Sequence, residues 1–230
     1  FAFDIETVPD TAFGRRLPGL EGLTEKQVGY VMQTPQREQT GSEFLSLEQH
    51  RVVAISVAMR TRDGFKTWSL GEPDTPEAEL VQRFFEGIER FSPTLVSWNG
   101  SGFDLPVLHY RALRHGVQAH RYWEMGEEDQ SFRWNNYISR FHWRHVDLMD
   151  VLSGFQGRGR VGLDKMAQLL GLPGKLGMSG ELVWDAFLAA RRLVSSSSFA
   201  ASGWLPMPTP ATGWLAMTCP VTDTSRVRPL

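Results

Sequence analysis

The stretch FAFDIETVPD, residues 1–10, decides the fold, because it has the pattern of a strand with one apolar face. Its apolar side chains leave one face, while Asp4 and Glu6, two residues apart, leave the other. Pro9 ends the strand just beyond the acids. Carboxylates at the carboxyl end of a strand lie where α/β sheets bind ligands, and two on one face can hold one hard cation. An Asp-x-Glu pair taken alone is also common as surface charge, so its position on the strand is what favours a site.

A hairpin and a helix are predicted next along the chain. Residues 51–59 and 65–70 are rich in β-branched and aromatic side chains, and the turn between them contains Asp63-Gly64. Thr75 as N-cap and Pro76 at the first helical position should open a helix. Its apolar stripe consists of Leu80, Phe84, Phe85 and Ile88.

A strand over 94–98 followed by a helix over 104–115 forms a βα unit. Three more helical segments are expected: one capped by Asp147 and running through Leu152, one over 163–170, and one over 183–193. The residues between 14 and 49 show little sustained periodicity, which predicts a long connection holding at most short helical pieces. The order of elements predicts an α/β fold with a mixed β-sheet flanked by helices.

Composition limits the class of protein. The 230 residues have a formal net charge of −2, 41% hydrophobic and 22% charged residues, which is ordinary globular usage and argues against global disorder. No apolar run approaches the roughly eighteen residues that span a bilayer, so we expect a soluble protein without a membrane partner. A single cysteine, Cys219, can form neither an intramolecular disulfide nor a thiolate zinc site, which favours the cytoplasm. The start at Phe1, inside an apolar run, suggests a truncated N-terminus.

A third acid, Asp104, follows the strand over 94–98 after the turn Trp98-Asn-Gly-Ser-Gly-Phe-Asp104. The two glycines allow a sharp bend and leave space for a substrate. The alternative is that Asp104 is only the N-cap of the following helix, and the two roles are compatible.

Three motifs resemble one family as an ordered set. They are FDIETVP at 3–9, WNGSGFDLPVL at 98–108 and HVDLMDVLSG at 145–154, supported by Leu163-Asp164 and by GLPGK at 171–175. They resemble the predicted 3′-5′ exonucleases related to the exonuclease domain of family-B DNA polymerases, which belong to the DEDD, ribonuclease-H-like superfamily. The resemblance covers roughly residues 1–191 and implies a ribonuclease-H-like domain over 1–192. From Leu193 onward a serine run and alternating prolines replace any helix or strand pattern, which predicts an irregular or disordered tail over 193–230.

The resemblance implies that Asp4 and Glu6 form the first exonuclease motif and Asp104 the second. In the family pattern these acids bind two Mg²⁺ or Mn²⁺ ions, with Asp4 shared between both, Glu6 serving one and Asp104 the other. Two such ions stabilise the attacking and leaving oxygens of a phosphodiester displacement and lower the pKa of water. Hard oxygen ligands without thiolates favour Mg²⁺ or Mn²⁺ over zinc.

The family's third motif, Tyr-x-x-x-Asp on a late helix, is absent from this sequence. No tyrosine follows Tyr137, and after Asp185 the sole acid is Asp223. Glu181 and Asp185 precede the expected place and lack the tyrosine, so neither is assigned to the site. Either one ion-binding corner is lost, or the residues from about Arg192 translate a shifted reading frame, which we favour. Asp147 and Asp150 are interpreted as structural.

Residues 132–145 mix aromatic side chains with arginines, a combination that stacks bases and neutralises phosphates. The alternative is a helix whose buried stripe is Trp134, Tyr137 and Phe141. Arg140 is the favoured phosphate contact, Lys175 a second one, and Asn99 either bonds a terminal nucleotide or fixes its own turn.

The expected function is therefore a 3′-5′ exonuclease that hydrolyses single-stranded DNA with two metal ions. The alternative is a nucleic-acid-binding protein that has lost cleavage together with the third motif. An exonuclease that trims RNA is a third possibility, because the motifs do not recognise the 2′-hydroxyl.

Overall fold

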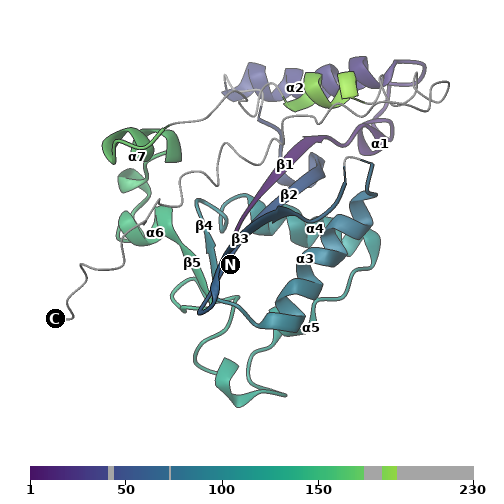
Figure 1. Cartoon of the computed structure of the whole chain (residues 1–230). Helices are drawn as coiled ribbons and strands as arrows, with labels where there is room; N and C mark the ends of the chain where they lie inside the picture. The colour runs from purple at the N-terminus through teal and green to yellow at the C-terminus, as the bar shows by residue number, and fades with distance from the viewer. Residues whose placement is uncertain (41–43, 73, 174–182, 191–230) are drawn as a thin grey trace, which may run out of the picture.

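A computed structural model describes residues 1–40, 44–72, 74–173 and 183–190 of the chain (Figure 1). Its centre is a five-stranded sheet in the order β3-β2-β1-β4-β5. The first three strands are antiparallel neighbours, whereas β4 is parallel to β1 and β5 is parallel to β4. This mixed sheet flanked by helices confirms the predicted fold class. The strands are β1 Ala2–Pro9, β2 His50–Thr61, β3 Gly64–Ser69, β4 Leu95–Ser97 and β5 His145–Asp147.

The helices lie on both sides of the sheet. In Figure 1, α3, α4 and α5 lie on one side of the sheet and α6 and α7 on the other. Within the described part of the chain, no helix is long and apolar enough to cross a membrane. The α-helices are α1 Thr11–Gly14, α2 Glu25–Thr40, α3 Glu77–Phe91, α4 Asp104–His115, α5 His120–Trp123, α6 Leu148–Leu152 and α7 Leu163–Leu169, with a further helix over 183–190. Three short 3₁₀ helices are η1 Leu47–Gln49, η2 Gln130–Phe132 and η3 Gly157–Gly159.

The main core lies between α3 and the sheet. Phe84 and Ile88 are fully buried, and the ring of Phe84 lies 5.0 Å from that of Phe3 on β1. Burying each such side chain contributes roughly 1.5–3 kcal/mol. The predicted apolar stripe is therefore confirmed, and it fixes which face of β1 points away from the core.

The start of α3 differs from the prediction. The N-cap position is Pro76 and the helix begins at Glu77. Thr75 does not cap the helix, because its hydroxyl accepts a hydrogen bond from the Glu72 N–H at 2.8 Å instead. The predicted hairpin, by contrast, is confirmed, with Thr61 paired to Gly64 across the turn.

The expectation of only short helical pieces between 14 and 49 is wrong, because α2 has 16 residues. Its buried Val28 and Met32, four residues apart, pack with Leu20 and Leu45 in a separate small core. Gly29 and Pro35 interrupt the sequence pattern, which conceals this helical period. The helix nevertheless forms, because Val28 and Met32 are buried against Leu20 and Leu45 and this packing stabilises it.

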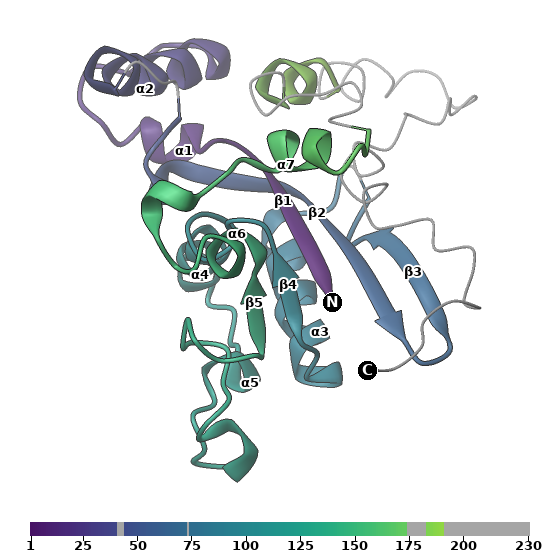
Figure 2. The same ribbon diagram turned by 90° about the vertical axis from the view of Figure 1, so that its left-hand side faces the viewer.

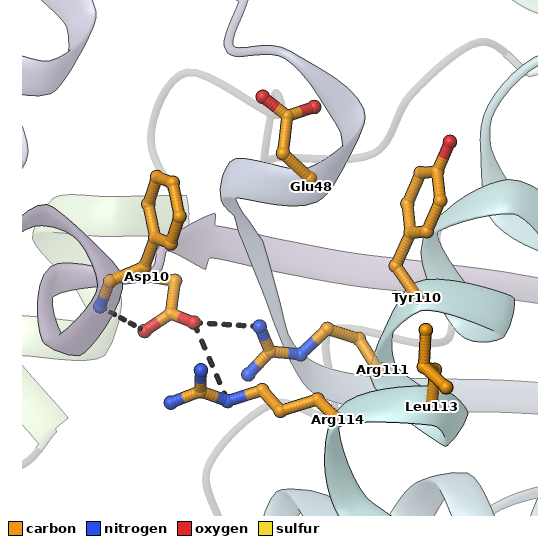
Figure 3. Close-up of a pocket in the computed structure, with 7 residues that line it drawn as sticks. Asp10, Glu48, Tyr110, Arg111, Leu113 and Arg114 are labelled. Carbon is orange, nitrogen blue, oxygen red and sulfur yellow. Dashed lines mark hydrogen bonds and ion pairs between the residues drawn. The ribbon is translucent and has the colours of Figure 1, made fainter.

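A buried ionic cluster joins the end of β1 to α3 and α4. Arg111 of α4 is 3% exposed and binds the carboxylates of Asp10 and Glu77, with an Nη1–Oδ2 distance of 2.6 Å to Asp10. Figure 3 shows that the carboxylate of Asp10 faces Arg111 and the more exposed Arg114. Asp10 also caps α1 by accepting a hydrogen bond from the Phe13 N–H. Burial alone would lower the pKa of Arg111, but the two carboxylates hold it above its ordinary value. The cluster therefore fixes α4, and with it Asp104, against the sheet.

Two predicted features lie outside the described residues. They are Lys175 and the tail over 193–230.

Candidate active site

β1 presents two acids on the face opposite the α3 core. Phe3 and Ile5 are each 5% exposed. Asp4, which lies between them, and Glu6, which follows Ile5, are partly exposed. The predicted alternation of faces is thus confirmed. Opposite these acids, the pairing with β2 shifts between Glu6 and Thr7, a bulge of the kind that often lies beside active sites.

Asp104 reaches β1 from the first turn of α4. It is 5% exposed, and its Oδ1 accepts a hydrogen bond from the Ile5 N–H at 3.2 Å. This contact is possible because β4 pairs with β1 only at Ala2–Val96, which leaves the later part of β1 without a strand on that side. Ile5 lies between Asp4 and Glu6, so the contact brings the second predicted motif beside the first.

The N-cap interpretation of Asp104 is wrong. The N-cap position belongs to Phe103, which makes no side-chain capping bond, and Asp104 is already the first helical residue. The carboxylate of Asp104 therefore accepts a hydrogen bond from β1 and does not serve as the N-cap of α4.

Burial raises the pKa of Asp104 to about 7, and the negative charges of Asp147 and Glu6 add to this shift, against the hydrogen bond from Ile5. An acid in this position is poorly solvated and faces two like charges. A cation bound among these carboxylates would relieve both effects.

The turn between β4 and α4 is held by Asp147, at the end of β5. The two oxygens of Asp147 accept from the Asn99 N–H at 2.8 Å and the Ser101 N–H at 3.0 Å, and Asp147 is 6% exposed. It also caps α6 by accepting from the Met149 N–H at 3.1 Å, as predicted. The contacts of Asp147 to the turn do not follow from the sequence prediction, although the position of Asp147 at the end of a strand is a signal for them.

Close packing explains the glycines of this turn. A Cβ on Gly100 would lie 2.5 Å from the Cβ of Ser97, and one on Gly102 would lie 2.6 Å from the Oδ1 of Asn99. Asn99 itself has a φ of 64°, a left-handed conformation that asparagine tolerates better than most residues. The glycines are therefore required by the turn itself, which sets where α4 begins.

The set of donors fits a divalent cation by chemistry. It consists of carboxylate oxygens without thiolates, which are the ligands of Mg²⁺ and Mn²⁺. As they stand, however, the side chains do not close around an ion: among the described residues, no three His, Cys, Asp or Glu side chains form a metal-binding group.

Arg140, the expected phosphate contact, lies beside α6. Its Nε donates to Asp150 at 2.9 Å, and Arg160 donates to the other oxygen of Asp150 at 2.6 Å. Burial alone would raise the pKa of Asp150, yet the hydrogen bonds from the two arginines hold it below its ordinary value. Asp150 is thus a structural counter-ion for two exposed arginines.

Residues 133–144 form turns and bends rather than a helix. Trp134 is 80% exposed and Phe141 69% exposed, so the prediction of a buried helical stripe is wrong for both. Of the three aromatic residues, Tyr137 is buried, at 2% exposure.

The chain matches a known family. A family model described as a predicted 3′-5′ exonuclease related to the exonuclease domain of PolB matches residues 42–194. The match includes the turn, Asp104 and Asp147, and it begins after Asp4 and Glu6.

Proposed function

Because the chain belongs to this family of predicted 3′-5′ exonucleases, we propose that Asp4, Glu6 and Asp104 form a metal-dependent site for hydrolysis of phosphodiester bonds at the 3′ end of a nucleic acid. Single-stranded DNA is the favoured substrate. The observation that carries the proposal is the hydrogen bond from the Ile5 N–H to Asp104, because it joins the two acidic segments across 99 residues.

The acids have distinct proposed roles. Asp4 would contact both ions, Glu6 one of them and Asp104 the other. When bound, two divalent ions supply a lowered pKa for a water molecule and neutralise the charge that develops on the phosphate.

The remaining residues position these acids. Asp147 holds the backbone of Asn99 and Ser101 and thereby sets the start of α4. The buried cluster around Arg111 fixes the same helix near its other end. Such fixed placement matters because a displacement of about 1 Å can cost roughly a hundredfold in rate.

A digestion assay tests the proposal. A single-stranded DNA oligonucleotide labelled at its 5′ end is incubated with the protein and Mg²⁺ or Mn²⁺, or with EDTA. We expect a ladder shortened from the 3′ end with metal, no ladder with EDTA, and loss of the ladder in Asp4→Ala and Asp104→Asn. Asp63→Asn, at the exposed hairpin turn, is the matched control and should retain activity. An RNA oligonucleotide in parallel identifies the preferred sugar. Cleavage that survives both site variants would refute the assignment.

A nucleic-acid-binding protein without cleavage activity is the second candidate. Two observations favour it: the sequence has no tyrosine after Tyr137 for a third motif, and the described side chains form no three-ligand metal group. Binding of the same oligonucleotide without cleavage under any metal condition would support this candidate.

A further inference from the structure

Residues 131–162 are a segment whose exposed charges are all positive, although the whole chain has a net charge of −2. The segment contains five arginines and no lysine. Its two acids, Asp147 and Asp150, are 6% and 2% exposed and point inward to backbone N–H groups and to arginines. We call this segment the arginine–aromatic face.

Three large aromatic side chains of this segment are exposed. Trp134, Phe141 and Trp143 are 80%, 69% and 68% exposed. Arg133 lies over the ring of Trp134 at 5.6 Å, and Phe141 contacts Phe155 with ring centroids 5.0 Å apart. Three such exposed rings within residues 134–143 suggest a binding role.

The backbone beneath these rings is firmly anchored. Tyr137 is buried, stacks on Tyr122 and donates its hydroxyl to the Pro93 carbonyl at 2.6 Å. The Oδ1 of Asn136 accepts from the Ser139 N–H at 2.9 Å, and the Oδ1 of Asn135 accepts from the Trp143 N–H at 2.9 Å. The loop therefore presents its aromatic rings from a fixed frame, which lowers the entropic cost of binding.

The face continues along the outer edge of the sheet to the candidate active site. Figure 2 shows the connection from α5 to β5 at one end of the sheet and α6 at the other end of β5. Contacts of Arg140 with Asp150 and of Phe141 with Phe155 join the loop to the region around α6. From there the carbonyl of Val161 accepts from the Nε1 of Trp98, at the start of the turn before Asp104, at 3.1 Å.

We propose that the arginine–aromatic face binds the single-stranded part of a nucleic acid whose 3′ end lies at the carboxylate site. Unpaired bases stack on Trp134, Phe141 and Trp143, while the exposed arginines neutralise phosphates. The inference rests on the proposed function for the direction of the strand. It adds a selection rule, because the bases of a duplex are already stacked and cannot use the exposed rings.

Charge decides between a nucleic acid and a protein as the occupant. The arginines of residues 131–162, where both acids are buried, complement a polyanion, whereas the exposed Glu127 and Glu128 lie just before the segment. Aromatic rings that lie beside guanidinium groups are the combination that binds single strands without sequence preference.

Binding is measured in EDTA, so that the result does not depend on cleavage. The probe is a fluorescein-labelled single-stranded DNA oligonucleotide of about 20 nucleotides, and its fluorescence anisotropy reports binding. RNA of the same sequence and duplex DNA are measured in parallel. Trp134→Ala and Phe141→Ala should each weaken single-strand binding about tenfold, and Trp134→Phe should retain most of it. The matched control is Phe65→Ala on β3, which is 49% exposed at the opposite edge of the sheet and should bind as wild type.

A salt series tests the charge component. Arg133→Gln should reduce the slope of log affinity against log salt by about 0.7, the value for one phosphate contact to a single strand. Thermal unfolding of each variant checks that its fold is intact, and we expect little change because the substituted side chains are exposed.

The outcomes separate this inference from the proposed function. Lost binding in the face variants without any cleavage by the wild type would support the face and refute the nuclease. Cleavage by the wild type with unchanged binding in Trp134→Ala and Phe141→Ala would refute the face and leave the nuclease standing. Absence of wild-type binding, or equal loss in Phe65→Ala, would also overturn the inference.

Discussion

Replacing Asp147 by asparagine tests whether this carboxylate holds the turn that places Asp104. Asp147 accepts three backbone hydrogen bonds, of 2.8, 3.0 and 3.1 Å, at 6% exposure. Two of them reach Oδ1 and one reaches Oδ2. Asparagine keeps the size and one acceptor oxygen, but its amide nitrogen would face the Ser101 N–H with a second donor.

The expected cost follows from that change. One charge-assisted hydrogen bond is lost and a buried donor remains unpaired, so we expect the free energy of unfolding to fall by about 1.5–3 kcal/mol. In a domain of this size, that is a drop in Tm of roughly 3–12 °C. Asp147→Ala, which removes all three bonds, should cost more.

Urea denaturation followed by circular dichroism measures this effect. Asp63→Asn, at the exposed turn of the β2–β3 hairpin, makes the same chemical change and should alter stability by less than about 0.5 kcal/mol. If Asp147→Asn were no less stable than Asp63→Asn, the assigned role of Asp147 in the turn would be refuted.

Three further changes test the surrounding structure. Arg111→Ala should lower the free energy of unfolding, measured in urea, by about 3–5 kcal/mol, because the buried carboxylates of Asp10 and Glu77 lose Arg111. The control Arg62→Ala, at an exposed position, should lower it little, and an equal loss in both variants would refute the role of the cluster. Burial lowers the pKa of His109 to about 4, so the unfolded chain binds a proton that the fold does not. Stability should therefore be complete above pH about 6.5 and fall by up to about 3 kcal/mol as the pH drops to about 4, and an unchanged slope in His109→Leu would contradict this. Gly100→Ala should lower Tm because its Cβ would overlap Ser97; a wild-type Tm would show that the turn has room.

Local patterns predict much of the fold. The βα unit is predictable because the short apolar strand, the Asn-Gly turn and the spacing of Leu105, Leu108 and Ala112 agree, and α4 has the predicted bounds of 104–115. The faces of β1 follow from simple alternation. The helix α2 is harder to predict, because Gly29 and Pro35 oppose it. It is stabilised by a capping box between Thr24 and Gln27 and by the tertiary packing of Val28 and Met32.

The candidate site is predictable in its residues and not in its contacts. The acids of β1 and the start of α4 follow from the sequence, whereas the hydrogen bond from Ile5 to Asp104 depends on where β4 stops pairing with β1. The contacts of Asp147 with the turn likewise join residues 48 positions apart, Asn99 in the turn and Asp147 at the end of β5. The exposure of Trp134 follows from the buried anchors of its loop, which no helical or strand period reveals.

The claim that the three acids share a metal site is tested most directly by isothermal titration calorimetry of Mn²⁺ into the protein without nucleic acid. If Asp4, Glu6 and Asp104 share a cation, the wild type binds Mn²⁺, and Asp104→Asn weakens this binding at least tenfold, while Asp63→Asn leaves it unchanged. Mn²⁺ binding of equal affinity in wild type and Asp104→Asn, or none in the wild type, would contradict a common metal site at the start of α4.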